Sequence, residues 1–227
     1  MGRILRVRWL FAGILSLGTT LFVAGCSGGG STRYRVMNAV PDEASLNVLV
    51  DSTSVSSNLA YGTSTGYTSI QSGSHQVAVE PAGSSTALLT QSISFASGSD
   101  RTIVASNFSS NIANLVLTDD NSAPTSGDFK IRVVNAAPSL GPADVYIVAP
   151  ASDLNTVSPT VSNLTFGAAT GYQSVTAGSY EVVLTPVGEK FAAVDTGSLS
   201  FAAGQVRTFV GLNGASGFTD TILQDVN

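Results

Sequence analysis

The chain has 227 residues, with 10 Lys and Arg against 15 Asp and Glu, so its formal net charge is −5. Such an acidic balance argues against binding of nucleic acid or of an anionic lipid headgroup by charge. It contains one cysteine and one histidine, which excludes an internal disulfide and a metal site built from histidine and thiolate ligands.

The N-terminus has the order of an export signal. Arg3, Arg6 and Arg8 precede an uncharged stretch at residues 9–23, and a charged segment followed by an apolar one is typical of exported proteins. This stretch is shorter than the roughly 20 residues that a membrane-spanning helix needs. We therefore interpret residues 1–25 as a cleaved signal peptide, the alternative being a retained transmembrane anchor.

The residues that follow decide between these two interpretations. Val23-Ala24-Gly25-Cys26 resembles the bacterial lipoprotein box, which implies diacylation of Cys26 and cleavage of the signal peptide in front of it. Two acyl chains anchor a protein stably in a membrane, whereas one binds only marginally. We expect a lipid membrane as partner through acyl chains on Cys26, with residues 26–33 as a flexible Gly- and Ser-rich tether.

The same resemblance carries an expectation about location. A lipid-anchored protein of this kind belongs to the cell envelope. In lipoproteins of cells with two membranes, an aspartate after the cysteine resembles an inner-membrane retention signal. Ser27 stands there instead, which favours the outer membrane if the cell has one.

Beyond the signal, the composition favours an all-β protein. Charged residues make up only 11% of the chain, and Ser, Thr, Gly, Ala and Val are abundant. Thr and Val favour strands, while Gly and Ser are typical of turns. No segment shows a sustained helical period.

The chain repeats itself. The segment YRVMNAVP from Tyr34 matches IRVVNAAP from Ile131, and the 26 residues that begin at Asn58 share 12 identities with those that begin at Asn163. A third match joins the segments from Ser92 and Ser198. The duplication predicts two domains of one fold, at residues 34–121 and 131–227, with a linker at residues 122–130.

Each copy shows short strands of period two. In the first copy Leu46, Val48 and Val50 share one face, as do Val77 and Val79, and the second copy has equivalent pairs. Roughly seven strands in about 90 residues predict an immunoglobulin-like β-sandwich for each copy. A β-barrel is the alternative.

The shared motifs also carry a family resemblance. They are an R-V-x-N-A-x-P opening, A-D-V-Y-I at residues 143–147, N-L-x-[YF]-G with T-G-Y, and a closing A-G-x-x-R-T strand. This pattern is similar to the domain of unknown function family 4397, although the first copy has LNVLV in place of ADVYI. The resemblance implies a β-sandwich module of exported and envelope proteins, with no established activity and no catalytic residues.

The chain offers little for catalysis, and we expect no catalytic residue, cofactor or metal. His75 aligns with Tyr180 of the second copy, which favours a packing residue at a strand end over a catalytic base. The tripeptide beginning at Asp195 matches that of aspartic proteases, which need two such aspartates. The first copy has Leu89-Thr90-Gln91 there, so we interpret residues 195–197 as a turn.

Two further groups deserve a chemical interpretation. Asp119, Asp120 and Asn121, with Asp128, offer oxygen ligands for calcium, but the spacing of an EF-hand loop is absent. We interpret them as a solvated strand end, with a weak calcium site as the alternative.

The second group is aromatic and lies near turns in both copies, where it predicts either a ligand platform or corner packing. Its members are Tyr61, Tyr67, Phe166 and Tyr172.

These observations lead to three functional hypotheses. The first is a non-enzymatic, membrane-anchored envelope lipoprotein that binds or adheres to an envelope protein, another macromolecule or a glycan. The alternative is a structural spacer or assembly subunit of the envelope. The third is a hydrolase that uses carboxylates such as Glu80 or Asp144, which is disfavoured because both alternate with apolar residues as outward strand positions.

Overall fold

The computed structural model describes residues 1–2 and 31–226. In this part of the chain the regular structure is β-strand, apart from one short 3-10 turn, η1 (Ser109–Asn111). The prediction of an all-β protein is therefore confirmed. Cys26 and almost all of the predicted signal peptide lie outside the described residues, so the predicted anchor stays a prediction.

The first copy forms a sandwich of two four-stranded sheets with the orders β4-β1-β7-β8 and β3-β2-β5-β6. Its strands are β1 (Thr32–Ala39), β2 (Ser45–Val50), β3 (Thr53–Ala60), β4 (Thr68–Ile70), β5 (Gly73–Pro81), β6 (Leu89–Phe95), β7 (Asp100–Ser106) and β8 (Ala113–Asp119).

The second copy repeats this arrangement in two five-stranded sheets. One has the order β12-β9-β17-β18 with β13 also paired to β9, and the other β11-β10-β14-β15 with β16 also paired to β14. The strands are β9 (Asp128–Asn135), β10 (Ala143–Val148), β11 (Val161–Leu164), β12 (Ala168–Ala169), β13 (Gln173–Thr176), β14 (Gly178–Pro186), β15 (Val194–Asp195), β16 (Leu199–Phe201), β17 (Val206–Gly214) and β18 (Gly217–Val226).

The alternating apolar residues build a separate core in each sandwich. Leu46, Val48 and Val50 of β2 point inward with Val77 and Val79 of β5, as their period of two predicts. In the second sandwich the core gathers around Phe129, Phe201 and Phe209, and the rings of Phe129 and Phe201 stack with centroids 4.4 Å apart. The predicted β-sandwich is therefore confirmed for each copy, and the alternative, a β-barrel, is not adopted.

Each sandwich also contains one parallel pair that the sequence pattern does not predict. β1 runs parallel to β7, and β9 runs parallel to β17. This pairing puts the first strand of each copy in the middle of a sheet, beside its second-to-last long strand. Parallel pairs are usually buried on both faces, and this is the case here.

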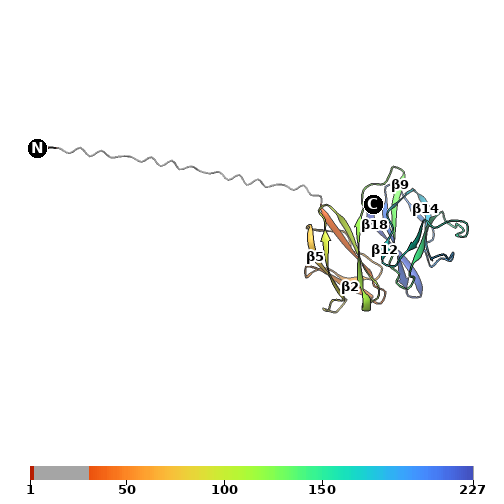
Figure 1. Ribbon diagram of the computed structural model, residues 1–227, viewed down its shortest axis with the longest axis horizontal. Coiled ribbons are helices and arrows are strands. Elements are labelled where there is room, and N and C mark those ends of the chain that lie inside the picture. Colours follow the sequence, from red (N-terminus) through yellow and green to blue (C-terminus); the bar gives the residue numbers. More distant parts are fainter. Residues whose placement is uncertain (3–30, 227) are drawn as a thin grey trace.

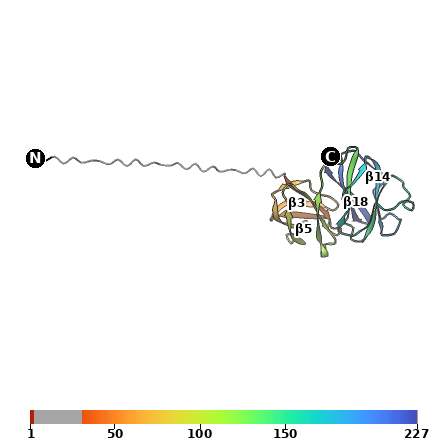
Figure 2. The same ribbon diagram turned by 45° about the horizontal axis from the view of Figure 1, so that its top comes forward.

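Both faces of β1 are covered because the two sandwiches pack against each other. Tyr34 and Val36 face the core of the first sandwich, whereas Met37 joins a third apolar cluster that contains residues of both copies. The buried members of this cluster are Met37, Ala39, Val104, Leu117, Val134, Ala136, Val210, Leu212 and Leu223. Figures 1 and 2 show the two sandwiches side by side, and the sheets that contain β1 and β9 supply the cluster. We call these the inner sheets.

The segment between the two sandwiches is short. β8 ends at Asp119 and β9 begins at Asp128, inside the range that we predicted as linker. The second sandwich begins before the predicted end of the linker because Phe129 is already part of its core and Lys130 already pairs with Val206 of β17.

Candidate functional site

Two of the four predicted platform residues lie between the sandwiches. The Tyr67 hydroxyl donates a hydrogen bond to Asp119 Oδ2 at 2.6 Å, and the Tyr172 hydroxyl donates one to Asp225 Oδ2 at 2.9 Å. Burial is the main cause that raises the pKa of both tyrosines, so both stay protonated and able to donate. The two tyrosines occupy equivalent positions of the two copies, as do the two aspartates.

Each aspartate also pairs with an arginine of the other sandwich. Arg35 of β1 binds Asp225 of β18, and Arg132 of β9 binds Asp119 of β8. The arginine side chains are 3% exposed and those of the aspartates 0%. Because Arg35 is equivalent to Arg132, the two ion pairs are reciprocal, as in the interface of a two-fold symmetric dimer. We call these four residues and the two tyrosines the Arg–Asp interface.

The remaining hydrogen bonds of the arginines follow the same symmetry. Arg35 Nε donates to Thr102 Oγ1 at 2.8 Å and its Nη1 to the carbonyl of Gln224 at 3.0 Å. Arg132 makes equivalent bonds, to Thr208 Oγ1 at 2.8 Å and to the carbonyl of Thr118 at 3.1 Å. A guanidinium group with neutral acceptors besides its carboxylate has more of its donors satisfied, which buried charges require.

The tyrosine rings complete the surroundings of these charges. Arg35 Cζ lies 4.7 Å from the centroid of the Tyr67 ring, and Arg132 Cζ lies 4.8 Å from that of Tyr172. Cations over aromatic faces are attracted by the ring quadrupole, more so when water is excluded. The rings thus fix the guanidinium planes and shield them from solvent.

Ion pairs also lie at the edge of the Arg–Asp interface, but they are more exposed. Lys130 Nζ lies 2.8 Å from Asp120 Oδ2. The bonds that Asp120 accepts from Lys130 and Ser122 lower its pKa to about 2. In the first sandwich Arg33 pairs with Asp100. Pairs that solvent reaches contribute little to stability.

The other two predicted platform residues differ from each other. The Tyr61 hydroxyl donates to the carbonyl of Asn213 in the second sandwich at 2.7 Å, and its ring packs against the shared apolar cluster. Burial raises the pKa of Tyr61 to about 12. Phe166, its equivalent in the second copy, is half-buried. The structure therefore does not gather the four aromatic residues on one open surface.

We predict that Tyr172→Phe destabilises the protein. The change removes the donor to Asp225 and keeps the ring over Arg132, and a hydrogen bond to a charged group contributes about 1.5–3 kcal/mol. Urea unfolding followed by circular dichroism measures the loss, and Tyr67→Phe should behave alike. Tyr172→Ala removes the ring as well and should cost more. Unchanged stability of Tyr172→Ala together with lost binding to envelope material would instead identify Tyr172 as a ligand platform.

The predicted solvated strand end at residues 119–121 needs a correction. Asp119 is buried, because its two oxygens accept bonds from Arg132, Thr102 and Tyr67. Sequence reasoning placed it beside the linker and missed the second sandwich that covers it. Within residues 31–226, no group of three or more His, Cys, Asp or Glu side chains is placed to hold a metal ion.

Two carboxylates that the sequence offered for hydrolysis, those of Asp144 and Asp195, accept hydrogen bonds from the backbone and thereby hold loops in place. Asp144 is buried rather than outward, and it accepts hydrogen bonds from the backbone N–H groups of Asn163 at 2.8 Å and Gly188 at 2.9 Å. Asp195 accepts one from Gly197 N–H at 2.8 Å, and Gly197 has a φ of 61°. This confirms a turn at residues 195–197. In the described part of the chain no pocket is found.

His75 lies at the start of β5 and packs on the core. Its ring meets Phe95 edge-on at a centroid distance of 5.7 Å, and its Nδ1 lies 2.6 Å from Asp51 Oδ2. The hydrogen bond to Asp51 is the main cause that raises the pKa of His75. These contacts fit the packing role predicted for a residue that aligns with a tyrosine.

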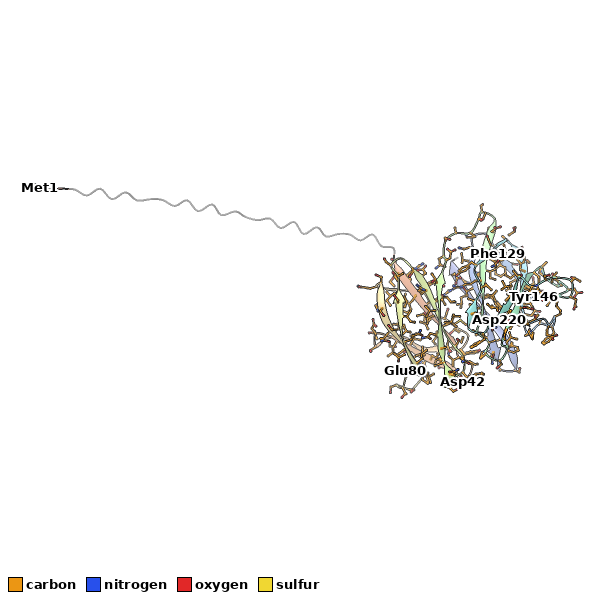
Figure 3. All side chains as sticks on the ribbon, in the orientation of Figure 1. Met1, Asp42, Glu80, Phe129, Tyr146 and Asp220 are labelled. Atoms are coloured by element: carbon orange, nitrogen blue, oxygen red, sulfur yellow. The ribbon has the colours of Figure 1, made fainter. Side chains whose placement is uncertain are left out.

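The second sandwich has a covered outer sheet, a feature that the sequence did not predict. Tyr146, labelled in Figure 3, lies between core residues Val145 and Ile147 on β10. It is nevertheless only 1% exposed. Lys190 Nζ donates to Tyr146 Oη and to the carbonyl of Val157, both at 2.9 Å. The segments 149–160 and 187–193 thus cover this face. Leu49, the equivalent of Tyr146, is only half-buried.

One of these covering segments carries the exposed aromatic side chain that sequence reasoning missed. Phe191 is 62% exposed and Val187 is 47% exposed, and both lie between β14 and β15. The available signal was an aromatic residue beside Glu189 and Lys190 in a loop whose counterpart, SSTAL at residues 84–88, is uncharged and has no ring.

The fold and these contacts define a class: a tandem β-sandwich protein whose two units are joined through their inner sheets. The chain belongs to the domain of unknown function family DUF4397, whose sequence model matches residues 33–146. The matched range begins in β1 and ends in β10, and over it the predicted resemblance is confirmed. No curated protein sequence matches the chain.

Several solved structures are similar at a low level. A family 26 carbohydrate-binding module from Eubacterium rectale in complex with maltoheptaose is 8% identical, over 86% of this chain and 98% of that one, with a TM-score of 0.29. Family 41 carbohydrate-binding modules from streptococcal virulence factors are 13% identical, over 79% of this chain and 93% of that one, with a TM-score of 0.24. The Bacillus anthracis TIE protein is 12% identical, over 85% of this chain and 34% of that one, with a TM-score of 0.24. Likeness at this level carries no argument about function.

The described part of the chain has no helix that is both long and apolar enough to cross a membrane.

Proposed function

We propose that this protein is a non-enzymatic binding module of the bacterial cell envelope, anchored by acyl chains on Cys26, whose ligand is an envelope glycan or another envelope macromolecule. The lipoprotein box at residues 23–26 supports the anchor. Tandem sandwiches on a tether present their surfaces away from the membrane. The outer membrane is the proposed location in a cell that has one.

One observation carries the binding role: the most exposed large apolar side chain between residues 31 and 226 is an aromatic one, Phe191. It lies on a loop that Lys190 fixes to Tyr146 and Val157. A rigidly held aromatic side chain offers a large contact area at a low entropy cost. Tyr67 and Tyr172, in contrast, have their hydroxyls bonded within the Arg–Asp interface, so we place the ligand contact at Phe191.

Binding is tested with the purified protein and insoluble envelope polysaccharide in a sedimentation assay. We expect saturable binding that Phe191→Ala weakens about tenfold, which corresponds to about 1.4 kcal/mol. Phe108→Ala is the matched control, because Phe108 is also exposed, at 39%, but lies in the first sandwich. Equal binding of all three proteins would remove Phe191 from the site, and failure of the normal protein to bind any envelope polysaccharide or protein fraction would refute the function.

The anchor is tested separately. Mass analysis of the peptide that contains Cys26 should show an acylated N-terminal cysteine, and Cys26→Ala should accumulate as an uncleaved precursor. Normal maturation of Cys26→Ala would overturn the lipoprotein assignment. Protease treatment of intact cells then locates the sandwiches: their loss places them outside the cell, and their protection until the envelope is opened places them within it.

A further inference from the structure

The first sandwich has an edge strand without the usual protection. β6 pairs with β5 and with no other strand of the described chain, so one side of its backbone lacks a strand partner. It is seven residues long with no break in register. From Pro81 to Ser99 the chain carries no charged side chain. An unpaired edge of this kind is a template for pairing with another chain, and proteins usually block it with charge, proline or a bulge.

Two comparable edges, one in the same sheet and one in the second sandwich, are interrupted. The opposite edge of the same sheet, β3, has two register shifts against β2. In the second sandwich the segment equivalent to β6 is divided into β15 and β16. The interruption is the Asp195–Gly197 turn, in which Asp195 replaces Leu89 and Gly197 replaces Gln91. Glu189 and Lys190 add charge nearby. The same edge is thus blocked in one copy and open in the other.

The open edge lies where a partner can reach it. β5, the neighbour of β6, is on the side of the first sandwich away from the second (Figure 1), in the sheet that does not contain β1. The outward side chains of β6, Thr90, Ser92 and Ser94, are exposed. The Arg–Asp interface and the shared apolar cluster lie on the other sheet, so pairing at β6 would leave them intact.

The sequence of β6 is complementary to itself. If two copies meet antiparallel with Ser92 opposite Ser92, then Thr90 faces Ser94 on the outer side. On the inner side Leu89 faces Phe95, and Gln91 faces Ile93. Hydroxyl pairs and aromatic–aliphatic pairs are favourable across strands, whereas like charges are not. This register places no charge opposite another, although the chain as a whole is acidic.

We infer that the protein forms a dimer in which the β6 strands of two copies pair antiparallel about Ser92 and join two four-stranded sheets into one of eight strands. This inference does not depend on the proposed ligand, because Phe191 lies in the other sandwich. The occupant of the edge is a second copy of this chain, not an unrelated peptide, because the β6 sequence supplies the matching residues itself.

Sedimentation velocity of the full chain in mild detergent tests the inference. We expect a concentration-dependent dimer, and Ser92→Lys should weaken association at least tenfold because two lysines then face each other at the centre. Ser92→Asp should do the same. Mixing the two variants should restore dimers, since opposite charges then meet. Ser92 is exposed in the monomer, and unchanged thermal unfolding confirms that both variants fold.

Ser198→Lys is the matched control, because Ser198 aligns with Ser92 and lies in the interrupted edge of the second sandwich. It should leave association unchanged. A normal protein that stays monomeric at every concentration would overturn the inference. So would a dimer that Ser92→Lys does not weaken, or one that Ser198→Lys weakens equally. An unrelated peptide as the natural occupant would show as a monomer that binds an added strand peptide at β6.

Discussion

Arg132→Ala is expected to lower the free energy of unfolding by about 3–5 kcal/mol, because removal of one partner of a buried ion pair leaves the other charge uncompensated. Asp119 would remain fully covered between the sandwiches with only Thr102 and Tyr67 as donors. Arg35→Ala should cost a similar amount, since it leaves Asp225 in the equivalent position. Urea unfolding followed by circular dichroism measures both.

The control for this prediction is a partly exposed pair whose arginine lies on β1, the strand that also carries Arg35. Arg33 binds Asp100 through two hydrogen bonds, but its side chain is 43% exposed, so Arg33→Ala should cost no more than about 1 kcal/mol. The double variant Arg132→Met/Asp119→Asn removes both charges at once. It should be more stable than the sum of the single effects predicts. A cost for Arg132→Ala as small as that of Arg33→Ala would mean that the interface opens to water in solution.

The buried ion pairs are better understood as determinants of geometry than as a source of net stability. Replacing a whole buried pair with apolar groups is often neutral, so the apolar cluster must supply most of the favourable energy of the interface. The two reciprocal pairs allow one relative placement of the sandwiches, because any slip of β1 along β18 separates Arg35 from Asp225. Covalent linkage of the two copies keeps their effective concentration high.

The sequence predicts much of the fold because each copy repeats the same local pattern. Leu46, Val48 and Val50 share a face in any strand, and two matching copies imply two matching units. The pattern cannot predict what covers the second face of β1. The period of two places Val36 and Met37 on opposite faces of the strand. The same pattern would arise whether Met37 were exposed to water or packed against another sandwich. The signal was present in Arg35 and Arg132, charged residues repeated in the middle of apolar strands.

The candidate site was harder to predict for a related reason. Tyr67 and Tyr172 were identified as a repeated pair near turns, but their partners come from strands at the far end of each copy. Asp119 lies next to a linker in sequence, which favours a solvated position, and only the reciprocal packing buries it. Phe191 has no counterpart in the first copy, so a comparison of the two copies passes over it.

Met37→Ala is expected to destabilise the protein by about 2–5 kcal/mol, the usual cost of truncating a buried large side chain. Met37 is fully buried, but it lies outside the core of its own sandwich and contributes to the cluster that the two sandwiches share. In a first sandwich standing alone, this side chain would lie on the sheet surface. The cost of the substitution therefore measures how firmly the sandwiches are joined.

Two controls bracket this measurement. Leu46→Ala truncates a fully buried residue of the first core and should cost about 2–5 kcal/mol whether or not the sandwiches are joined. Val55→Ala changes an exposed side chain of β3 and should stay within about 0.5 kcal/mol. If Met37→Ala behaves like Leu46→Ala, with an unchanged dependence on urea, the two sandwiches act as one cooperative unit. If it behaves like Val55→Ala, the shared cluster is open in solution, and the Arg–Asp interface cannot hold the sandwiches in one placement.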